Sequence, residues 1–207
     1  MKVAIVNYGM GNLASVRRAF EDIGAHSYIA DHPAAVYDAN RVVLPGVGAF
    51  SQGMQSLAAG GWVEALHDVV TRQHKPLLGI CLGMQMLASD GDEGGVAHGL
   101  GFVPGRIQRL DSLGCGLRLP HAGWNEVDYR ADDDFFEQIP DGSDFYFVHS
   151  YALVPEQQAH VLATTRYDCE VASVVRNRNI FGCQFHPEKS SKAGRQLLKN
   201  FMSYVPC

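Results

Sequence analysis

The stretch Leu78-Gly79-Ile80-Cys81-Leu82-Gly83-Met84-Gln85 decides how the rest of the chain is interpreted. It follows an apolar run and precedes residues of helical character, so we expect a strand, a tight turn at Cys81 and the start of a helix. Gly79 and Gly83 flank the cysteine in the G-x-nucleophile-x-G pattern of a nucleophile elbow, with sulfur in place of a hydroxyl. A thiol at a helix N-terminus also lies in the positive end of the helix dipole, which favours the thiolate. Alone, the stretch is equally compatible with a small buried cysteine between two packing glycines.

Strands and helices alternate on both sides of this turn. We expect strands at 3–6, 27–30, 41–44 and 76–80, and helices at 13–23, 50–57 and 62–72. Asn12 is the expected N-cap of the first helix, which Gly24 ends. Such strand–helix–strand units favour a parallel sheet with functional sites beyond the carboxyl ends of its strands. Gly9-x-Gly11, the loop at 45–48 and Cys81 all fall at that edge.

From about Asp90 the pattern changes to short strands separated by Gly and Pro. We expect strands at 102–103, 106–110, 125–129, 145–148, 161–164, 171–176 and 180–185, then a last helix at 193–204. The sequence therefore predicts an α/β fold: a mostly parallel central sheet flanked by helices, with an added antiparallel β layer in the C-terminal half that joins the first sheet. Asp132-Asp133-Asp134 is expected to be a solvated helix start. We expect residues 1–207 to form a single domain.

Composition and charge narrow the classes of function. A net charge of −5 gives no electrostatic reason to expect nucleic acid or an anionic membrane as a partner. The first apolar run is expected to be a strand rather than a signal peptide, and no run reaches membrane-spanning length. The five cysteines are scattered and form no C-x-x-C pair. The sequence thus predicts no metal site, no disulfide framework and a reducing, cytoplasmic location.

A nucleophilic cysteine needs a base, and that base needs an orienting group. The best candidate is Phe185-His186-Pro187-Glu188-Lys189, where the strand at 180–185 delivers His186 to its end. In an extended chain, residues two apart point to the same side at roughly 6–7 Å. Glu188 can therefore accept a hydrogen bond from the His186 ring and fix its tautomer. Without Cys81 upstream, this motif would more often be an ordinary strand-end turn.

An oxyanion formed at Cys81 would need backbone donors. Gly46-Val47-Gly48 has little side-chain bulk, so the amides of Val47 and Gly48 can turn toward a reacting carbonyl. The amide of Leu82, next to the nucleophile, is the natural further donor. The alternative for this loop is a plain strand-to-helix connection.

Three motifs together make the pattern specific: Pro-Gly-Val-Gly-Ala-Phe at 45–50, Gly-Ile-Cys-Leu-Gly-Met-Gln at 79–85 and Gln-Phe-His-Pro-Glu-Lys-Ser at 184–190. With them the chain resembles a class I (triad) glutamine amidotransferase domain. Further motifs at 7–13, 120–125 and 147–151 make it similar, more narrowly, to the glutaminase subunits of imidazole glycerol phosphate synthase in histidine biosynthesis. The resemblance covers nearly the whole chain and implies the flavodoxin-like fold of class I glutaminases.

The resemblance implies a mechanism for these residues. Cys81 attacks the side-chain amide of glutamine, and His186, held by Glu188, protonates the leaving ammonia before water hydrolyses the glutamyl thioester. No cofactor is implied. Glu93 suits the α-ammonium group of glutamine, although it also belongs to a flexible-looking acidic loop. The resemblance places these residues at the glutamine site: Gly46, Gln85, Glu93, His149, Ser150 and Tyr151.

The resemblance also implies a partner. In this family ammonia passes to a (β/α)8-barrel cyclase, which makes imidazole glycerol phosphate and an aminoimidazole carboxamide ribotide within a heterodimer. Asn12, Trp124 and Lys189 match family positions at or near that interface, while Trp124 is also compatible with a core tryptophan. Glutaminase activity is implied to be low until the loaded partner docks, with the peptide between residues 47 and 48 as the switch. Ala122 and an insert at 110–117 depart from the family pattern and leave the partner's identity less certain.

Three other functions stay open from the sequence. A paralogous subunit could feed ammonia to another amination, such as modification of a surface sugar, and would share every motif. A cysteine peptidase or other thiol hydrolase on a similar sheet would be active without a partner. A non-catalytic scaffold subunit would normally have lost Cys81, His186 or Glu188, and all three are present.

Overall fold

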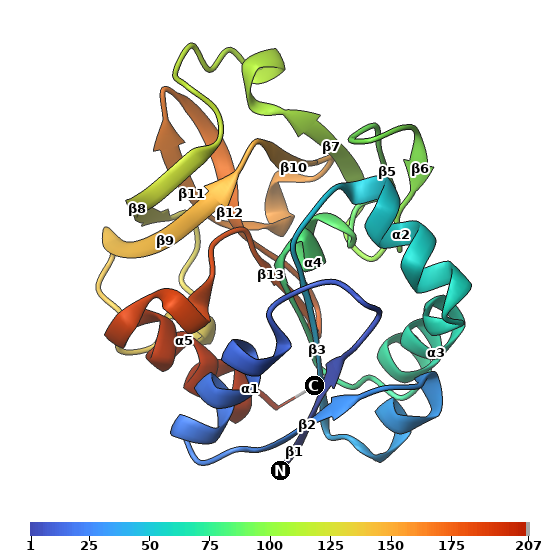
Figure 1. Cartoon of the computed structure of the whole chain (residues 1–207). Coiled ribbons are helices and arrows are strands. Elements are labelled where there is room, and N and C mark those ends of the chain that lie inside the picture. The colour runs from blue at the N-terminus through green and yellow to red at the C-terminus, as the bar shows by residue number, and fades with distance from the viewer. Residues whose placement is uncertain (206–207) are drawn as a thin grey trace.

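The computed structural model describes residues 1–205, and within them nine strands form one sheet in the order β2-β1-β3-β4-β13-β12-β11-β8-β9 (Figure 1). Its parallel part consists of β2 (His26–Ala30), β1 (Lys2–Val6), β3 (Arg41–Gly46), β4 (Leu77–Cys81) and β13 (Ile180–Cys183). The antiparallel part consists of β12 (Cys169–Asn177), β11 (Val161–Tyr167), β8 (His121–Tyr129) and β9 (Ser143–His149). The predicted α/β fold is confirmed.

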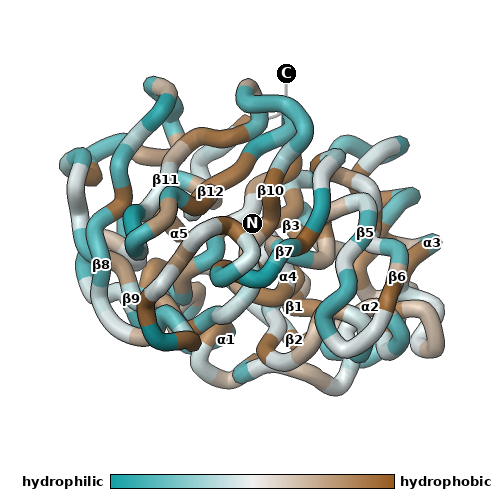
Figure 2. The backbone as a smooth tube through the Cα atoms, turned by 90° about the horizontal axis from the view of Figure 1, so that it is seen from above, coloured by the Kyte–Doolittle hydropathy of each residue, from teal (hydrophilic) through white to brown (hydrophobic). Residues whose placement is uncertain are grey.

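Helices cover both faces of the parallel part. On one face lie α1 (Leu13–Asp22) and α5 (Ser191–Ser203), and on the other α2 (Phe50–Ala59) and α3 (Trp62–His67), which continues as a π-helical segment, Asp68–Arg72 (Figure 1). In β1, Val3 and Ile5 pack in the cluster that contains Phe20 of α1, whereas Ala4 and Val6 pack in the cluster of α2 and α3. Because both faces are buried, the strands are continuous apolar runs. Figure 2 shows these hydrophobic segments inside the molecule.

Four further strands of the described chain form a second, small sheet in the order β10-β7-β5-β6. They are β10 (Tyr151–Pro155), β7 (Gly105–Arg109), β5 (Asp90–Gly91) and β6 (Ala97–His98). The strand expected near 106–110 therefore belongs to this sheet and does not extend the first one. The strand expected at 102–103 is wrong: the Val103 amide donates to Leu87 O at 2.9 Å, so this segment bonds to the turn after the elbow.

The antiparallel part of the large sheet curls back on itself. The last strand, β9, lies beside the segment that follows β13, because the His186 amide donates to Tyr146 O at 2.9 Å. The Ser190 hydroxyl strengthens this closure by donating to His186 O at 2.6 Å and accepting from the Tyr146 amide at 3.0 Å. The curl brings the end of β9 to Cys81, whose sulfur lies 4.0 Å from Val148 O.

Two local predictions have different outcomes. The Asn12 side chain accepts from the Ser15 amide at 3.2 Å and caps α1, as predicted. Asp133 caps the 3₁₀ turn Asp134–Phe136 but also forms an ion pair with Arg176, so a fully solvated start is wrong for this side chain. Within residues 1–205 no helix is long and apolar enough to cross a membrane, and no cluster of three or more His, Cys, Asp or Glu could hold a metal ion. Cys207 lies outside the described residues.

Candidate active site

The turn at Cys81 explains why glycines flank the cysteine. Cys81 ends β4 with φ 54° and ψ −110°, and the chain turns directly into α4 (Leu82–Gln85). A Cβ on Gly83 would lie 1.7 Å from Leu44 O, and one on Gly79 would lie 2.6 Å from Gly83 O. The two glycines therefore let α4 pack directly on β3 and β4.

The helix after the nucleophile is a single turn. It ends at Gln85 because the Leu87 and Ala88 amides bond to carbonyls three residues back, at 3.1 and 3.0 Å. A single helical turn has only a small dipole. The charge that stabilises a thiolate at Cys81 must therefore come mainly from a neighbouring side chain.

His186 is that neighbour. Its Nδ1 lies 2.8 Å from Glu188 Oε1, and both side chains are buried. The predicted contact is present, but the predicted extended chain is wrong: Pro187–Lys189 is a 3₁₀ turn, closed by the Lys189 amide donating to His186 O at 3.0 Å. The turn folds Glu188 back under the ring.

The ionisation of His186 favours a thiolate–imidazolium pair. Its Nε2 is buried and makes no hydrogen bond within residues 1–205. Burial lowers the pKa of His186, but the interactions of the ring with Cys81 and Glu188 outweigh burial and raise that pKa to about 9. The ring is therefore protonated at neutral pH, and its positive charge stabilises a negative charge on the Cys81 sulfur.

A cavity of about 500 Å³ opens over Cys81. Its wall contains most of the residues that the sequence placed at the glutamine and oxyanion sites: Val47, Gly48, Leu82, Gln85, Glu93, His149, Ser150 and Tyr151. Gly46 lies just outside this wall, paired with Cys81 in the β3–β4 ladder. A somewhat larger cavity, about 590 Å³, lies near the first residues of β13 and contains none of the predicted site residues.

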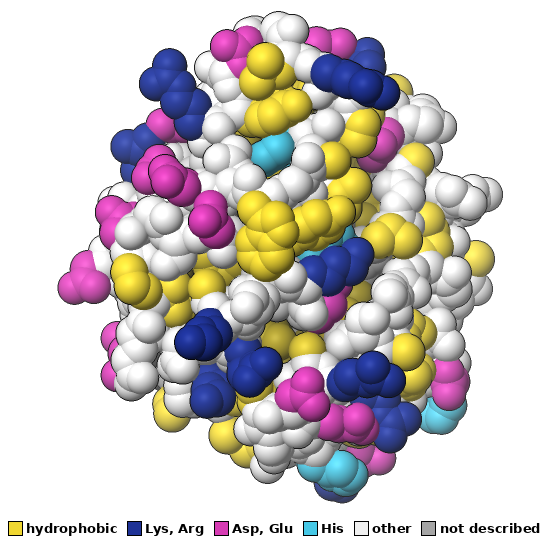
Figure 3. Space-filling view, turned by 60° about the vertical axis from the view of Figure 1, so that its left-hand side comes forward, with side chains coloured by type: hydrophobic (Ala, Val, Ile, Leu, Met, Phe, Trp, Pro, Cys, Tyr) yellow, Lys and Arg dark blue, Asp and Glu magenta, His cyan; other side chains and the backbone are white. Residues whose placement is uncertain are grey.

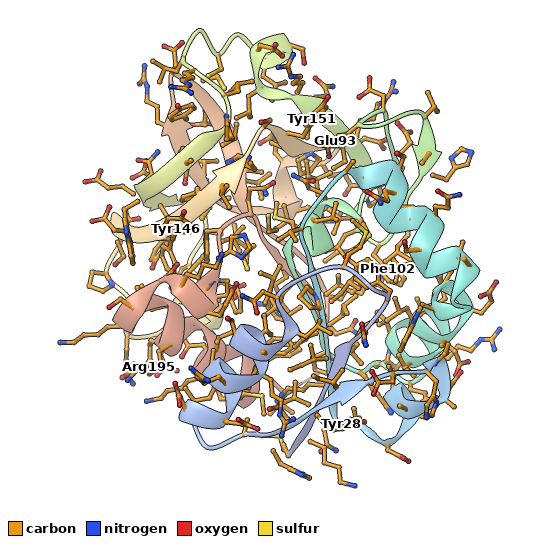
Figure 4. All side chains as sticks on the ribbon, viewed as in Figure 1. Tyr28, Glu93, Phe102, Tyr146, Tyr151 and Arg195 are labelled. Carbon is orange, nitrogen blue, oxygen red and sulfur yellow. The ribbon has the colours of Figure 1, made fainter. Side chains whose placement is uncertain are left out.

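The carboxylate of Glu93 is fixed rather than mobile. Its Oε2 accepts from the Phe50 amide at 3.1 Å, at the first turn of α2, and its carbonyl accepts from the Ser51 amide. Burial raises the pKa of Glu93, the Phe50 hydrogen bond opposes this shift, and the nearby charge of Asp92 adds to it. Glu93 and Tyr151 lie close together (Figure 4) on the wall of the same cavity.

The other pocket side chains are held by hydrogen bonds within the protein. The Gln85 amide group donates to Tyr151 O at 2.8 Å and to Gln184 Oε1 at 3.1 Å. Both ring nitrogens of His149 are bonded, one to Tyr151 O and the other to His121. The Ser150 carbonyl accepts from the Leu110 amide. The pocket wall on this side is therefore a connected polar network.

The loop expected to supply oxyanion donors is exposed at the cavity. Val47 is 45% exposed, and Gly48 has φ 121°, in the left-handed region that favours glycine. A Cβ on Gly48 would also lie 2.6 Å from Met10 Cε. Any other residue at this position would strain the loop.

The predicted interface residues differ in their surroundings. Trp124 is 54% exposed, which rules out a core role, and its ring meets the Tyr146 ring edge-on at 6.1 Å. Lys189 Nζ lies 5.7 Å from the centre of the Tyr146 ring. Trp124 and Lys189 line one shallow cavity of about 210 Å³ with Glu188 and Arg195. Asn12 is exposed and acts as a helix cap.

On this side of the molecule a hydrophobic patch has both basic and acidic side chains around it (Figure 3). Figure 4 places Tyr146 and Arg195 on this side, near β9 and α5.

Two groups of buried polar residues were not among the predicted site residues. Gln184 accepts from Gln85 and places its Nε2 3.8 Å from the Cys81 sulfur. Its position two residues before His186 was a usable signal, since alternate residues of a strand share a face. His121 and Asn125 lie in the motif at 120–125, and His121 contacts His149. A histidine within an otherwise apolar strand start was the only signal for this contact.

The model of the protein family described as "Glutamine amidotransferase class-I" matches residues 4–204 of the chain. The imidazole glycerol phosphate synthase subunit HisH of Moorella thermoacetica is 47% identical to it, over 98% of this chain and 95% of that protein. The protein of the same name from Symbiobacterium thermophilum is 48% identical over 97% and 92%. That of Geobacter sulfurreducens is 42% identical over 97% of each.

Solved structures show the same fold. The structure of PurLQS from Thermotoga maritima has a TM-score of 0.74 at 19% identity and covers 98% of each chain. A structure described as a glutamine amidotransferase has a TM-score of 0.74 at 17% identity, over 96% of this chain and 98% of that one.

Proposed function

Because the chain belongs to the class I glutamine amidotransferases, and within them to the family of imidazole glycerol phosphate synthase subunit HisH, we propose that it hydrolyses glutamine through a thioester on Cys81. The observation that carries this function is the buried His186–Glu188 pair beside Cys81, which lines a cavity of about 500 Å³. A protonated imidazole next to a strained, turn-borne sulfur is the arrangement that thiol nucleophiles require.

The reaction proceeds in two halves. The Cys81 sulfur attacks the side-chain carbonyl carbon of glutamine, and the proton on His186 Nε2 passes to the departing nitrogen, which leaves as ammonia. Water then attacks the thioester while His186 takes its proton, and glutamate leaves with the thiolate restored. Glu188 keeps the ring oriented through Nδ1 in both halves.

The negative oxygen formed in each half needs donors. The amide of Leu82 follows the nucleophile directly, and Val47 and Gly48 line the same cavity. In our proposal the peptide between Val47 and Gly48 completes this set when it turns inward. The exposure of the loop leaves room for that rotation.

The cavity wall supplies the groups that bind the rest of glutamine. Glu93 uses Oε2 for the Phe50 amide, so its Oε1 is the oxygen for the α-ammonium group. Gln85 uses its amide hydrogens within the protein, so its carbonyl oxygen is directed to substrate. His149, Ser150 and Tyr151 line the same pocket, and Gly46 lies just outside it, paired with Cys81.

The relatives are named as subunits of imidazole glycerol phosphate synthase, so the chain acts within a complex. We propose a (β/α)8-barrel cyclase as the partner that receives the ammonia and makes imidazole glycerol phosphate and the aminoimidazole ribotide. The surface around Trp124, Tyr146 and Lys189 is the proposed docking site, with Asn12 at its margin. The cavity at this surface also reaches Glu188 of the triad. A catalytic thiol suits a reducing compartment, and we propose the cytoplasm.

The test measures glutamate release by the chain alone and with a candidate barrel cyclase and its nucleotide ligand. We expect release to rise strongly in the complex, with imidazole glycerol phosphate as a product, and to be abolished by Cys81→Ser. Trp124→Ala with Lys189→Ala should weaken association while iodoacetamide still alkylates Cys81 at the wild-type rate. Turnover that survives Cys81→Ser would refute the mechanism. Glutaminase activity at the full rate without a partner would refute the proposal that the chain is a subunit that passes ammonia to a partner.

A further inference from the structure

A chain of hydrogen bonds, buried at its two histidines, runs from the glutamine pocket into strand β8. His149 Nδ1 lies 2.8 Å from Tyr151 O, and His149 Nε2 lies 2.9 Å from His121 Nδ1. His121 Nε2 in turn lies 3.1 Å from Asn125 Nδ2, which also donates to Arg166 O. Both histidines are nearly inaccessible to solvent.

The position of each proton follows from the partners. A carbonyl oxygen only accepts, so His149 donates from Nδ1 to Tyr151, and its neutral ring must accept at Nε2. His121 therefore donates from Nδ1, and its own Nε2 accepts from the Asn125 amide. Burial lowers the pKa of both histidines to about 4, so both rings are neutral at physiological pH and the chain of donors is self-consistent.

This arrangement changes the role of His149. Since both of its nitrogens are bonded within the protein, it can hold the pocket but has no nitrogen to offer to glutamine. It holds Tyr151 O, the same oxygen that accepts from Gln85. The orientation of two pocket residues thus depends on the His149 ring.

The ring of His121 is itself tightly placed. It stacks on Phe147 at 4.7 Å and on Tyr167 at 4.1 Å between ring centres. The Tyr167 hydroxyl donates to Arg118 O, so the stack is anchored to the loop before β8. His121 cannot rotate away from His149 without breaking this stack.

We propose that His121 is a positioning residue for glutamine: it fixes the tautomer and orientation of His149, and through His149 the Tyr151 carbonyl and Gln85. This inference rests on the proposed glutaminase function. It concerns substrate binding rather than bond cleavage, because no hydrogen bond within residues 1–205 joins His121 directly to Cys81, His186 or Glu188. Asn125 holds the His121 ring in place by donating to its Nε2.

The test compares His121→Phe with His121→Asn in the chain assembled with its partner. Phenylalanine keeps the aromatic stack but leaves His149 Nε2 unpaired, and we expect KM for glutamine to rise about tenfold or more with kcat changed less than about threefold. Asparagine places an amide nitrogen near the position of Nδ1 and should recover much of the KM. His67→Phe is the matched control: its ring packs on Phe102 at 4.6 Å, away from the pocket, and should leave both constants unchanged.

The rate of Cys81 alkylation by iodoacetamide, followed against pH, separates the possible results. An unchanged alkylation profile with a raised KM supports the inference. An unchanged KM in an active His121→Phe complex overturns it, and so does a parallel loss of kcat, alkylation rate and stability, which would mark a purely structural role. Absence of glutamate release by the wild-type complex would instead refute the proposed function. If His121→Phe does not fold, Asn125→Ala tests the same chain and should raise KM in the same direction.

Discussion

At the scale of single residues, Cys81 has a backbone conformation that its own side chain disfavours. Its φ of 54° and ψ of −110° belong to a region that glycine occupies far more easily than any residue with a Cβ. The surrounding structure maintains this conformation, because Gly79 and Gly83 pack the turn against β3 and β4. The strain keeps the sulfur at the corner, beside His186, where it can meet a substrate.

Because of this strain, we expect glycine at position 81 to stabilise the fold relative to alanine, the reverse of its usual effect in a strand. We expect Cys81→Gly to be more stable to unfolding than Cys81→Ala by about 1 kcal/mol, because glycine relieves the conformation and alanine does not. In β1, where Ala4 has ordinary strand geometry, Ala4→Gly should instead destabilise by at least about 0.5 kcal/mol. Urea denaturation of the three variants measures these differences in stability. A Cys81→Ala variant more stable than Cys81→Gly would contradict the prediction.

The protonation of His186 predicts how stability depends on pH. Its pKa rises from the ordinary 6.5 to about 9 because, despite burial, the partners Cys81 and Glu188 stabilise the charged ring. This contribution is fully present below pH 6.5 and is lost as pH rises through 9, since the unfolded chain releases the proton first. Between these values the free energy of unfolding should fall by on the order of 3 kcal/mol more in the wild type than in His186→Gln.

Denaturation at pH 6, 7.5 and 9 provides the measurement. The control is Glu188→Gln, which keeps the imidazole but removes one charge that supports its protonation. The free energy of unfolding of this variant should therefore fall less with rising pH than that of the wild type. Parallel pH dependence in the wild type and His186→Gln would show that the folded state does not hold this proton.

At the scale of elements, α2 depends on a residue from another loop. The helix begins at Phe50 after Ala49, which offers no side-chain cap, and Glu93 supplies the missing acceptor from more than forty residues away. The same side chain lines the cavity over Cys81. In the proposed function, one carboxylate oxygen therefore serves the helix start and the other binds the substrate.

Substitution of Glu93 should separate these two roles. We expect Glu93→Gln to keep the Phe50 hydrogen bond, so stability changes little while KM for glutamine rises, because the negative charge facing the α-ammonium is lost. Glu93→Ala should lose both and destabilise by about 1 kcal/mol. Thermal unfolding and glutaminase kinetics of the pair provide the measurement. Equal stability of the two variants would argue against the capping role.

The sequence predicted these elements well where local pattern governs them. Asn12 caps α1 through a bond only three residues away, and the apolar runs of β1, β3 and β4 are strands because a short continuous apolar run indicates a buried strand whatever its partners are. It failed at 102–103, where an apolar pair bonds to the turn at Leu87, and at Asp133, whose partner Arg176 is 43 residues away. Such partners have no signature in the local sequence.

At the scale of the whole molecule, closure of the curled sheet positions His186, the proposed catalytic histidine. Ser190 joins the two ends of the curl, donating to His186 O and accepting from the Tyr146 amide. It is almost completely buried, so neither partner can turn to water if the hydroxyl is removed. His186 is thus held by β9, the strand farthest from β2 in the sheet order.

Ser190→Ala should destabilise the protein by about 1–3 kcal/mol and lower kcat, because the Tyr146 amide loses its acceptor and the His186 segment loosens. Ser203→Ala, which removes a hydroxyl bonded to Asn200 O at the end of α5, should cost less than about 0.5 kcal/mol. Urea denaturation and partner-stimulated glutaminase rates test both. A Ser190 variant as stable and active as the Ser203 variant would show that closure does not depend on this hydroxyl.

The parallel sheet and the contact between His186 and Glu188 could be predicted because their motifs are contiguous or nearly so. The curl of β9, the second small sheet and the contacts of Gln184 and His121 could not, because each depends on pairs far apart in the chain. The relatives show the family, while these contacts emerge only once the sheet has closed.

The exposure of Trp124 has a practical consequence. The chain has two tryptophans, and the other, Trp62, is sealed in the core. A Trp62→Phe chain would carry a single indole, half open to water at the proposed docking surface. Its fluorescence should shift to shorter wavelength when a partner covers it, so the protein contains its own optical reporter of assembly.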